Sequence, residues 1–73
     1  MNVYERLAIR IRKLRKQREW SQEDLADAAG LHRTYVSHIE NAKRDISVET
    51  MCRIAMAFGL TPSKLMVGIR FDE

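Results

Sequence analysis

The sequence contains one cysteine and no apolar run that approaches the length of a membrane span. A lone cysteine excludes a disulfide framework and is typical of a reducing compartment. Cys52 lies in an apolar helical segment, where we expect a small buried hydrophobic side chain. The first ten residues lack the apolar core of a signal peptide. We therefore expect a cytoplasmic location and no contact with a membrane.

The sequence also lacks the residue sets that enzymes and metal proteins need. It contains no recognisable Ser/His/Asp arrangement, glycine-rich phosphate loop or pair of carboxylates suited to a pocket. Cys52, His32 and His38 do not have the number or spacing of zinc ligands. We predict that the chain is not an enzyme and uses no metal and no cofactor.

The length of 73 residues predicts a single domain over residues 1–73. A core of this size supplies little stability, so small domains often oligomerise. The net charge of +3 is modest but unevenly placed. Residues 1–20 carry seven Lys and Arg against two Glu, whereas residues 21–30 carry three acids and no base. This asymmetry suggests contact with a polyanion, although a basic helix can also be merely solvated.

Hydrophobic spacing and capping residues predict five short helices in a compact all-α bundle. Leu7, Ile11 and Leu14 form one apolar stripe of a helix from residue 2 or 3 to residue 17 or 18. Three of the later helices should begin after hydroxyl N-caps, and two should end at glycine. Ser21 opens a helix that ends at Gly30; the next runs from residue 33 to 40 or 41; Ser47 opens one that Gly59 closes; Thr61-Pro62 opens a last one that ends near residue 67.

The stretch from Gln22 to Ile39 predicts two helices joined by a tight turn at Gly30. On the second helix, Val36 and Ile39 share an apolar face. The opposite face carries only groups that can form hydrogen bonds, namely Arg33, Thr34, Ser37, His38 and Asn41. The major groove of DNA admits one α-helix and offers base edges to such side chains.

This stretch resembles the helix-turn-helix of phage repressors and Cro proteins (the XRE family). The motif residues stand at the expected offsets: Ala26, Gly30, Val36 and Ile39. The segments SQEDLA and RTYVSHIEN extend the match, and HRTYVS.IE…R.IS is especially similar to the small controller proteins of restriction–modification systems. The resemblance runs from about Leu7 to Leu65. It implies a repressor-like DNA-binding domain with a central helix-turn-helix.

The resemblance also implies roles for individual residues. Base reading is expected from Arg33, Thr34, Ser37 and His38, with Arg33 suited to guanine O6 and N7. Phosphate contacts are expected from Gln22, Tyr35, Asn41, Lys43 and Arg44, although Lys43 and Arg44 could also be an ordinary charged loop. A salt bridge between Arg15 and Glu40 should position the recognition helix. His32 should lie at the start of that helix, near the backbone.

Related proteins usually have glycine where this chain has Ala42, so that the chain leaves the recognition helix in a left-handed turn. Asparagine tolerates that conformation better than alanine. We therefore expect Asn41 to adopt the left-handed conformation in place of residue 42.

The C-terminal segment is rich in large apolar side chains that one short helix cannot bury on a single face. Exposed apolar patches mark partner surfaces, and a two-fold DNA site suits a two-fold protein. We predict residues 61–71 as a dimerisation segment, with an interface of Leu65, Met66, Ile69 and Phe71. The alternative is that Ile69 and Phe71 fold back over the core.

The sequence predicts a transcriptional regulator that binds double-stranded DNA as a homodimer, with half-sites about 34 Å apart. The resemblance suggests the autoregulatory controller of a restriction–modification operon, acting on a palindromic operator. We expect no small-molecule effector, and contact with RNA polymerase is a further expectation. The alternative is an antitoxin-type protein that binds a toxin and represses its operon, which the apolar tail would serve equally well.

Overall fold

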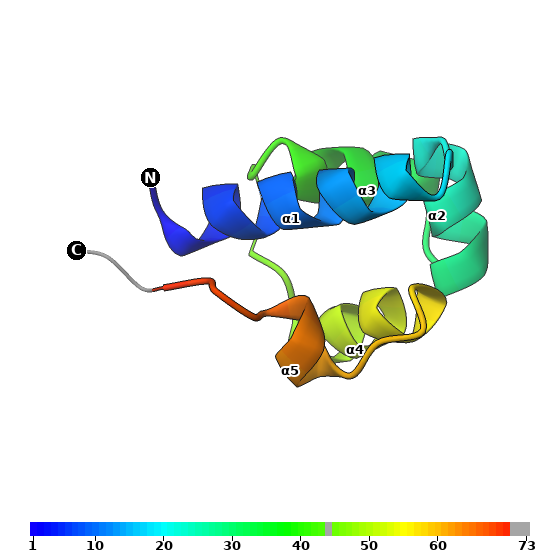
Figure 1. Cartoon of the computed structure of the whole chain (residues 1–73). Helices are drawn as coiled ribbons and strands as arrows, with labels where there is room; N and C mark the ends of the chain where they lie inside the picture. Colours follow the sequence, from blue (N-terminus) through cyan, green and yellow to red (C-terminus); the bar gives the residue numbers. More distant parts are fainter. Residues whose placement is uncertain (44, 71–73) are drawn as a thin grey trace.

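The computed structural model describes residues 1–43 and 45–70. This part of the chain contains five helices and no strand (Figure 1): α1 (Val3–Gln17), α2 (Gln22–Ala29), α3 (Arg33–Glu40), α4 (Val48–Ala57) and α5 (Pro62–Leu65). The predicted all-α bundle of five short helices is therefore confirmed. None of these helices is long and apolar enough to cross a membrane, a finding that covers the described residues alone.

Each helix begins at a side chain that accepts a hydrogen bond from a backbone N–H of the first turn. These N-caps are Asn2, Ser21, His32, Ser47 and Thr61. The caps of α1 and α2 are full capping boxes, because Glu5 and Asp24 bond back to the cap N–H. Such caps accept hydrogen bonds from backbone N–H groups that have no partner within the helix. This explains why the later helices start at the residues that the sequence predicted.

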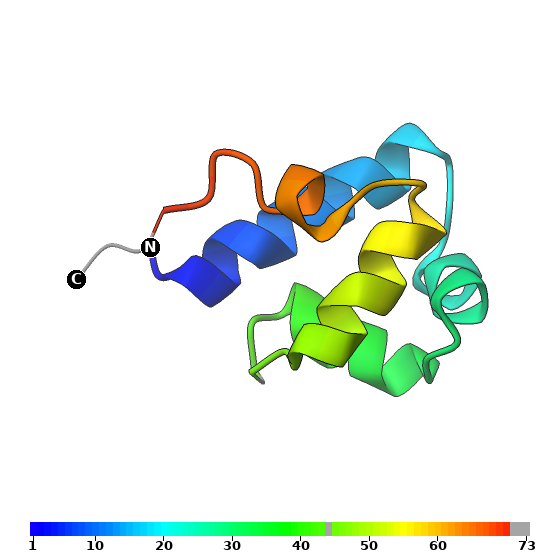
Figure 2. The same cartoon turned by 90° about the horizontal axis from the view of Figure 1, so that it is seen from below.

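The helices form two layers. Figure 1 shows α1 and α3 running along one side of the molecule, with α4 and α5 on the other and α2 closing one end. Seen from below, α3 crosses the directions of α1 and α4 (Figure 2). Direct packing joins α2 to α3, α1 to α3, α2 to α4 and α4 to α5. The helix-turn-helix α2–α3 is thus held between the longest helix and α4.

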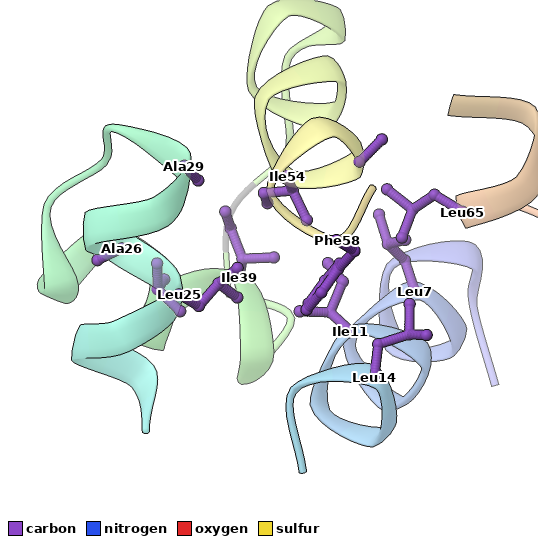
Figure 3. Packing of buried hydrophobic residues seen from close by; sticks show 12 residues of the cluster. Leu7, Ile11, Leu14, Leu25, Ala26, Ala29, Ile39, Ile54, Phe58 and Leu65 are labelled. Atoms are coloured by element: carbon purple, nitrogen blue, oxygen red, sulfur yellow. The ribbon is translucent and has the colours of Figure 1, made fainter. Parts of the chain in front are cut away.

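The core lies where these layers meet, and its buried side chains come from all five helices (Figure 3). Ile11, Leu25, Ile54 and Leu65 are completely buried. On α4, Ile54 and Ala55 are buried in the core as expected, and so is Phe58 at its C-cap, while Met51 is only partly buried. Cys52 is half-buried, so the prediction that it is a core side chain was wrong. Its position on α4 lies at the edge of the inward stripe.

The turn after α3 differs from the expectation. Ala42 has φ = 55°, whereas Asn41 stays near the helix with φ = −98°. Two backbone bonds of about 3.0 Å close the turn, from Ala42 N to Ile39 O and from Lys43 N to His38 O. In this pattern the left-handed residue is the one after the cap. Asn41 also donates from Nδ2 to Ser37 O at 2.9 Å, which keeps it in the last helical turn.

The C-terminal segment differs from the predicted dimer interface. Leu65 has no exposed surface and belongs to the core, so it cannot form part of an interface. Met66 and Ile69 are half-buried and pack against the core, as the fold-back alternative expects for Ile69. Val67, between them, is 63% exposed. Phe71 and Arg44, for which roles were also predicted, lie outside the described residues.

Candidate nucleic-acid interface

The recognition helix α3 has two faces of opposite character. Val36 and Ile39 are 1% and 4% exposed, and both belong to the core cluster. Arg33 and Thr34 are exposed, and Ser37 and His38 are half-buried. These four predicted base readers therefore share the side of the helix that faces away from the core. The helix is fixed on one face and offers hydrogen-bonding groups on the other.

The first turn of α3 is set by His32. Its Nδ1 accepts a hydrogen bond of 3.0 Å from the backbone N–H of Thr34. Imidazole thus replaces the usual hydroxyl or carboxylate cap. Because His32 has extended backbone, the helix starts directly after it, and Arg33 becomes an exposed first residue.

The other end of α3 is anchored by a buried ion pair. Glu40 is 2% exposed, and its two carboxylate oxygens accept hydrogen bonds of 2.8 and 2.9 Å from Arg15 Nε and Nη2. The side chain of Arg15 is itself only 12% exposed. The hydrogen bond to Glu40 raises the pKa of Arg15, against a lowering by burial. A two-pronged pair of this kind fixes the helix in orientation as well as position.

Gln22 joins this anchor from the N-terminus of α2. Its Nε2 donates to Glu40 Oε1 at 3.3 Å, so one amide hydrogen is engaged within the protein. Gln22 also lines an open hollow with Arg15 and Arg33, between the first turns of α2 and α3. The second amide hydrogen and the amide oxygen are not used by Glu40. The predicted phosphate residue is thus held in place by the same carboxylate that orients α3.

Of the remaining predicted phosphate contacts, Tyr35 lies in the first turn of α3, and Asn41 and Lys43 lie at and beyond its C-terminal end. Asn41 and Lys43 are exposed, and Tyr35 is half-buried on the flank of the helix. The bond from Asn41 to Ser37 O keeps its amide on the α3 surface. Gln22 and Arg33 therefore mark one end of a polar strip and Lys43 the other.

The comparisons with known proteins agree with this geometry. A helix-turn-helix family model matches residues 11–65. The chain belongs to this helix-turn-helix family. The predicted resemblance to XRE-type proteins is confirmed, and the protein is a DNA-binding transcription regulator of that class.

Several relatives of this helix-turn-helix protein are control proteins. The control protein C.SmaI of Serratia marcescens is 36% identical over 75 residues, which cover 100% of this chain and 89% of that protein. The control protein C.MunI of a Mycoplasma species is 40% identical over 65 residues, 88% of each. The crystal structure of the restriction-modification controller protein C.AhdI from Aeromonas hydrophila has a TM-score of 0.81 at 34% identity, over 85% of this chain and 94% of that one.

One residue of this helix-turn-helix site was not foreseen. Arg12 donates from Nη2 to the backbone oxygen of Glu40 at 2.5 Å, and its Nε lies 3.7 Å from Glu40 Oε1. Arg12 therefore caps the C-terminal end of α3, where carbonyl groups lack partners. Its spacing of three residues from Arg15 places both on one side of α1, which was a signal available in the sequence.

Proposed function

We propose that this protein is a sequence-specific regulator that binds a palindromic operator as a homodimer and controls its own restriction–modification operon. The observation that carries the proposal is the outward polar face of α3, held from behind by the Glu40 anchor. Base recognition needs side chains presented on a helix that does not shift. The control proteins among its relatives and the similarity to the restriction-modification controller protein C.AhdI favour the restriction–modification assignment.

The residues of this polar face and of the turn after it divide into readers and clamps by their chemistry. Arg33 offers a planar fork of donors that matches guanine O6 and N7, and Thr34 and Ser37 offer a methyl group or hydroxyls to neighbouring bases. Lys43 is a flexible point charge beyond the end of the helix, suited to a phosphate rather than to one base. Contacts by Gln22 and Asn41 to phosphates would fix the register of α3 on the duplex.

The homodimer would use the surface around Met66, Val67 and Ile69. Val67 is largely exposed, whereas Met66 and Ile69 pack partly against the core. The patch is therefore apolar and rests on the core. A two-fold pair of recognition helices would then meet major grooves about one turn of DNA apart. A dimer on an operator beside a promoter would also be placed to contact RNA polymerase. No small-molecule effector enters this scheme.

The test is a selection of bound fragments from random DNA, followed by footprinting and by the mass of the free protein in solution. The proposal expects a dimeric protein and a palindromic site. Affinity should fall with salt by about 0.9 in log K per log salt for each phosphate neutralised. A monomer that selects no sequence, shows no salt dependence and stays in solution only with a second protein would favour the antitoxin alternative.

A further inference from the structure

One nitrogen of His38 is buried inside the protein and has no hydrogen-bond partner among the described residues. His38 Nδ1 has essentially no solvent-accessible surface, and no described group bonds it. The side chain as a whole is half-buried on the outward side of α3. Nε2 forms no hydrogen bond with the described residues and is not among their buried atoms. It is therefore the ring nitrogen that faces solvent.

This asymmetry selects one arrangement of the imidazole proton. A neutral imidazole carries one N–H donor, and its other nitrogen is an acceptor. A buried N–H without an acceptor is one of the rarest defects in proteins, whereas an acceptor lacking a donor is tolerated more often. The proton therefore belongs on Nε2. His38 presents a donor to the outside and hides its lone pair at Nδ1.

We propose that His38 reads the operator as a pure hydrogen-bond donor, through Nε2–H, to an acceptor on a base edge; this inference rests on the proposed DNA-binding function. The acceptors in the major groove are purine N7, guanine O6 and thymine O4. The exocyclic amines of cytosine and adenine are donors and give such a group no partner. His38 therefore discriminates by which base presents an acceptor.

The position of His38 on the helix favours a base over a phosphate. Arg33, Thr34 and His38 lie at spacings of one, four and five residues, which place them on one strip of α3. Ser37 belongs to the same strip, while Lys43 lies beyond the helix. The side chain is short and half-buried, so it cannot swing away from that strip as a lysine can. A phosphate oxygen of the DNA backbone is the competing acceptor, and substitutions of the bases distinguish it from a base edge.

The proton can be located in the free protein, without DNA. Long-range nitrogen–proton correlation NMR distinguishes Nε2–H from Nδ1–H when the imidazole ring of the wild-type chain is neutral. The inference expects the His38 proton on Nε2. A proton on Nδ1 would overturn it and would leave the proposed function untouched. A protein that selects no DNA sequence would instead contradict the proposed function.

A pair of amide variants tests the same donor on DNA. In His38→Gln the amide nitrogen stands close to the place of Nε2, whereas in His38→Asn it stands close to the place of Nδ1. His38→Gln should keep the affinity for the selected operator within about threefold, and His38→Asn should lose about tenfold. Equal losses in the two variants would contradict a donor at Nε2. Matching thermal unfolding of both variants serves as the control for folding.

The base contact shows itself in the pattern of preference. Each half-site position is replaced in turn by the other three bases, and wild type is compared with His38→Ala. The inference expects one position at which the preference for an acceptor-bearing base weakens by about tenfold in the variant. A loss of equal size for every sequence would place the donor on a phosphate and overturn the base contact.

Discussion

Two regions of the molecule are held by arginines of the same helix, but with different partners. At α3, Arg15 meets a buried carboxylate, with Glu40 only 2% exposed. At α5, Arg10 donates to two neutral carbonyl oxygens, those of Leu65 and Lys64, at 3.3 and 3.1 Å. The first set of bonds is charged, directional and shielded from water, and the second is partly exposed. The recognition helix is thus oriented by polar bonds, while the C-terminal segment depends on apolar packing.

This difference matches what the proposed function requires of each region. A helix that reads bases must hold its side chains within a narrow range of positions. A surface that meets a second copy of the chain needs apolar area more than orientation. The same basic helix α1 serves both, which explains part of its excess of positive charge by bonds within the protein. The basic charge of residues 1–20 is therefore not simply a DNA-binding surface.

The largest effect is expected at the buried ion pair. Glu40→Gln removes the charge that compensates Arg15 and should lower the free energy of unfolding by about 3–5 kcal/mol, because one buried charge is left unpaired. Urea unfolding followed by circular dichroism measures this change.

The matched control is Glu49→Gln on α4. Glu49 pairs with Arg53 at 3.3 Å, but their side chains are 80% and 49% exposed. The same substitution there should change stability by less than about 0.5 kcal/mol. If the two variants lost equal stability, the contrast between a buried anchor and a surface pair would not hold.

The second effect separates core from surface within the C-terminal segment. Leu65→Ala should cost about 2–5 kcal/mol, since it leaves a cavity at a side chain with no exposed surface. Val67→Ala should cost less than about 0.5 kcal/mol in the monomer but weaken self-association. Sedimentation equilibrium with urea unfolding measures both. An unchanged dimer in Val67→Ala would place the interface on another face.

The third effect concerns DNA and distinguishes a reader from a clamp. Arg33→Ala should lose about 1–3 kcal/mol of discrimination at one base pair in each half-site. Lys43→Ala should weaken binding to all sequences alike and reduce the salt slope by about 1. Titrations of cognate and random duplexes at several salt concentrations check both. Identical profiles for the two variants would show that the assignment of roles is wrong.

Much of this architecture was predictable from the sequence, for local reasons. The N-caps Ser21, Ser47 and Thr61 and the spacing of apolar residues depend only on neighbours in the chain, so they fixed the helix starts. The pairing of Arg15 with Glu40 came from the resemblance. Arg12 was missed although its spacing from Arg15 was visible in the sequence, because its hydrogen-bond partner is a backbone oxygen that the packing of α1 on α3 brings within reach.

The C-terminal segment was predicted less well for a related reason. Composition shows that the segment is apolar, but it does not show which side chains the core can accept. Leu65 fills a place between α1 and α4 and is completely buried, whereas Val67, two residues later, is exposed. Deciding between them requires the positions of helices that are distant in the sequence.

The smallest effect, and the one most sensitive to backbone geometry, is expected at the turn after α3. Ala42 adopts φ = 55°, a conformation that costs a residue with a Cβ about 1–2 kcal/mol. Ala42→Gly removes that strain but adds freedom to the unfolded chain, so the net gain in stability should be about 0.5–1 kcal/mol.

Ala28→Gly is the control for this last substitution, because Ala28 is exposed within α2 and has ordinary helical geometry. The same change there should lower stability by about 0.5–1 kcal/mol. Stability changes of opposite sign for the same Ala→Gly substitution would assign the strain to the left-handed residue Ala42. DNA affinity should stay unchanged in Ala42→Gly because the turn keeps its shape. If Ala42→Gly were destabilising, the left-handed residue of this turn would be Asn41 and not Ala42. Lys43 would then leave α3 in another direction.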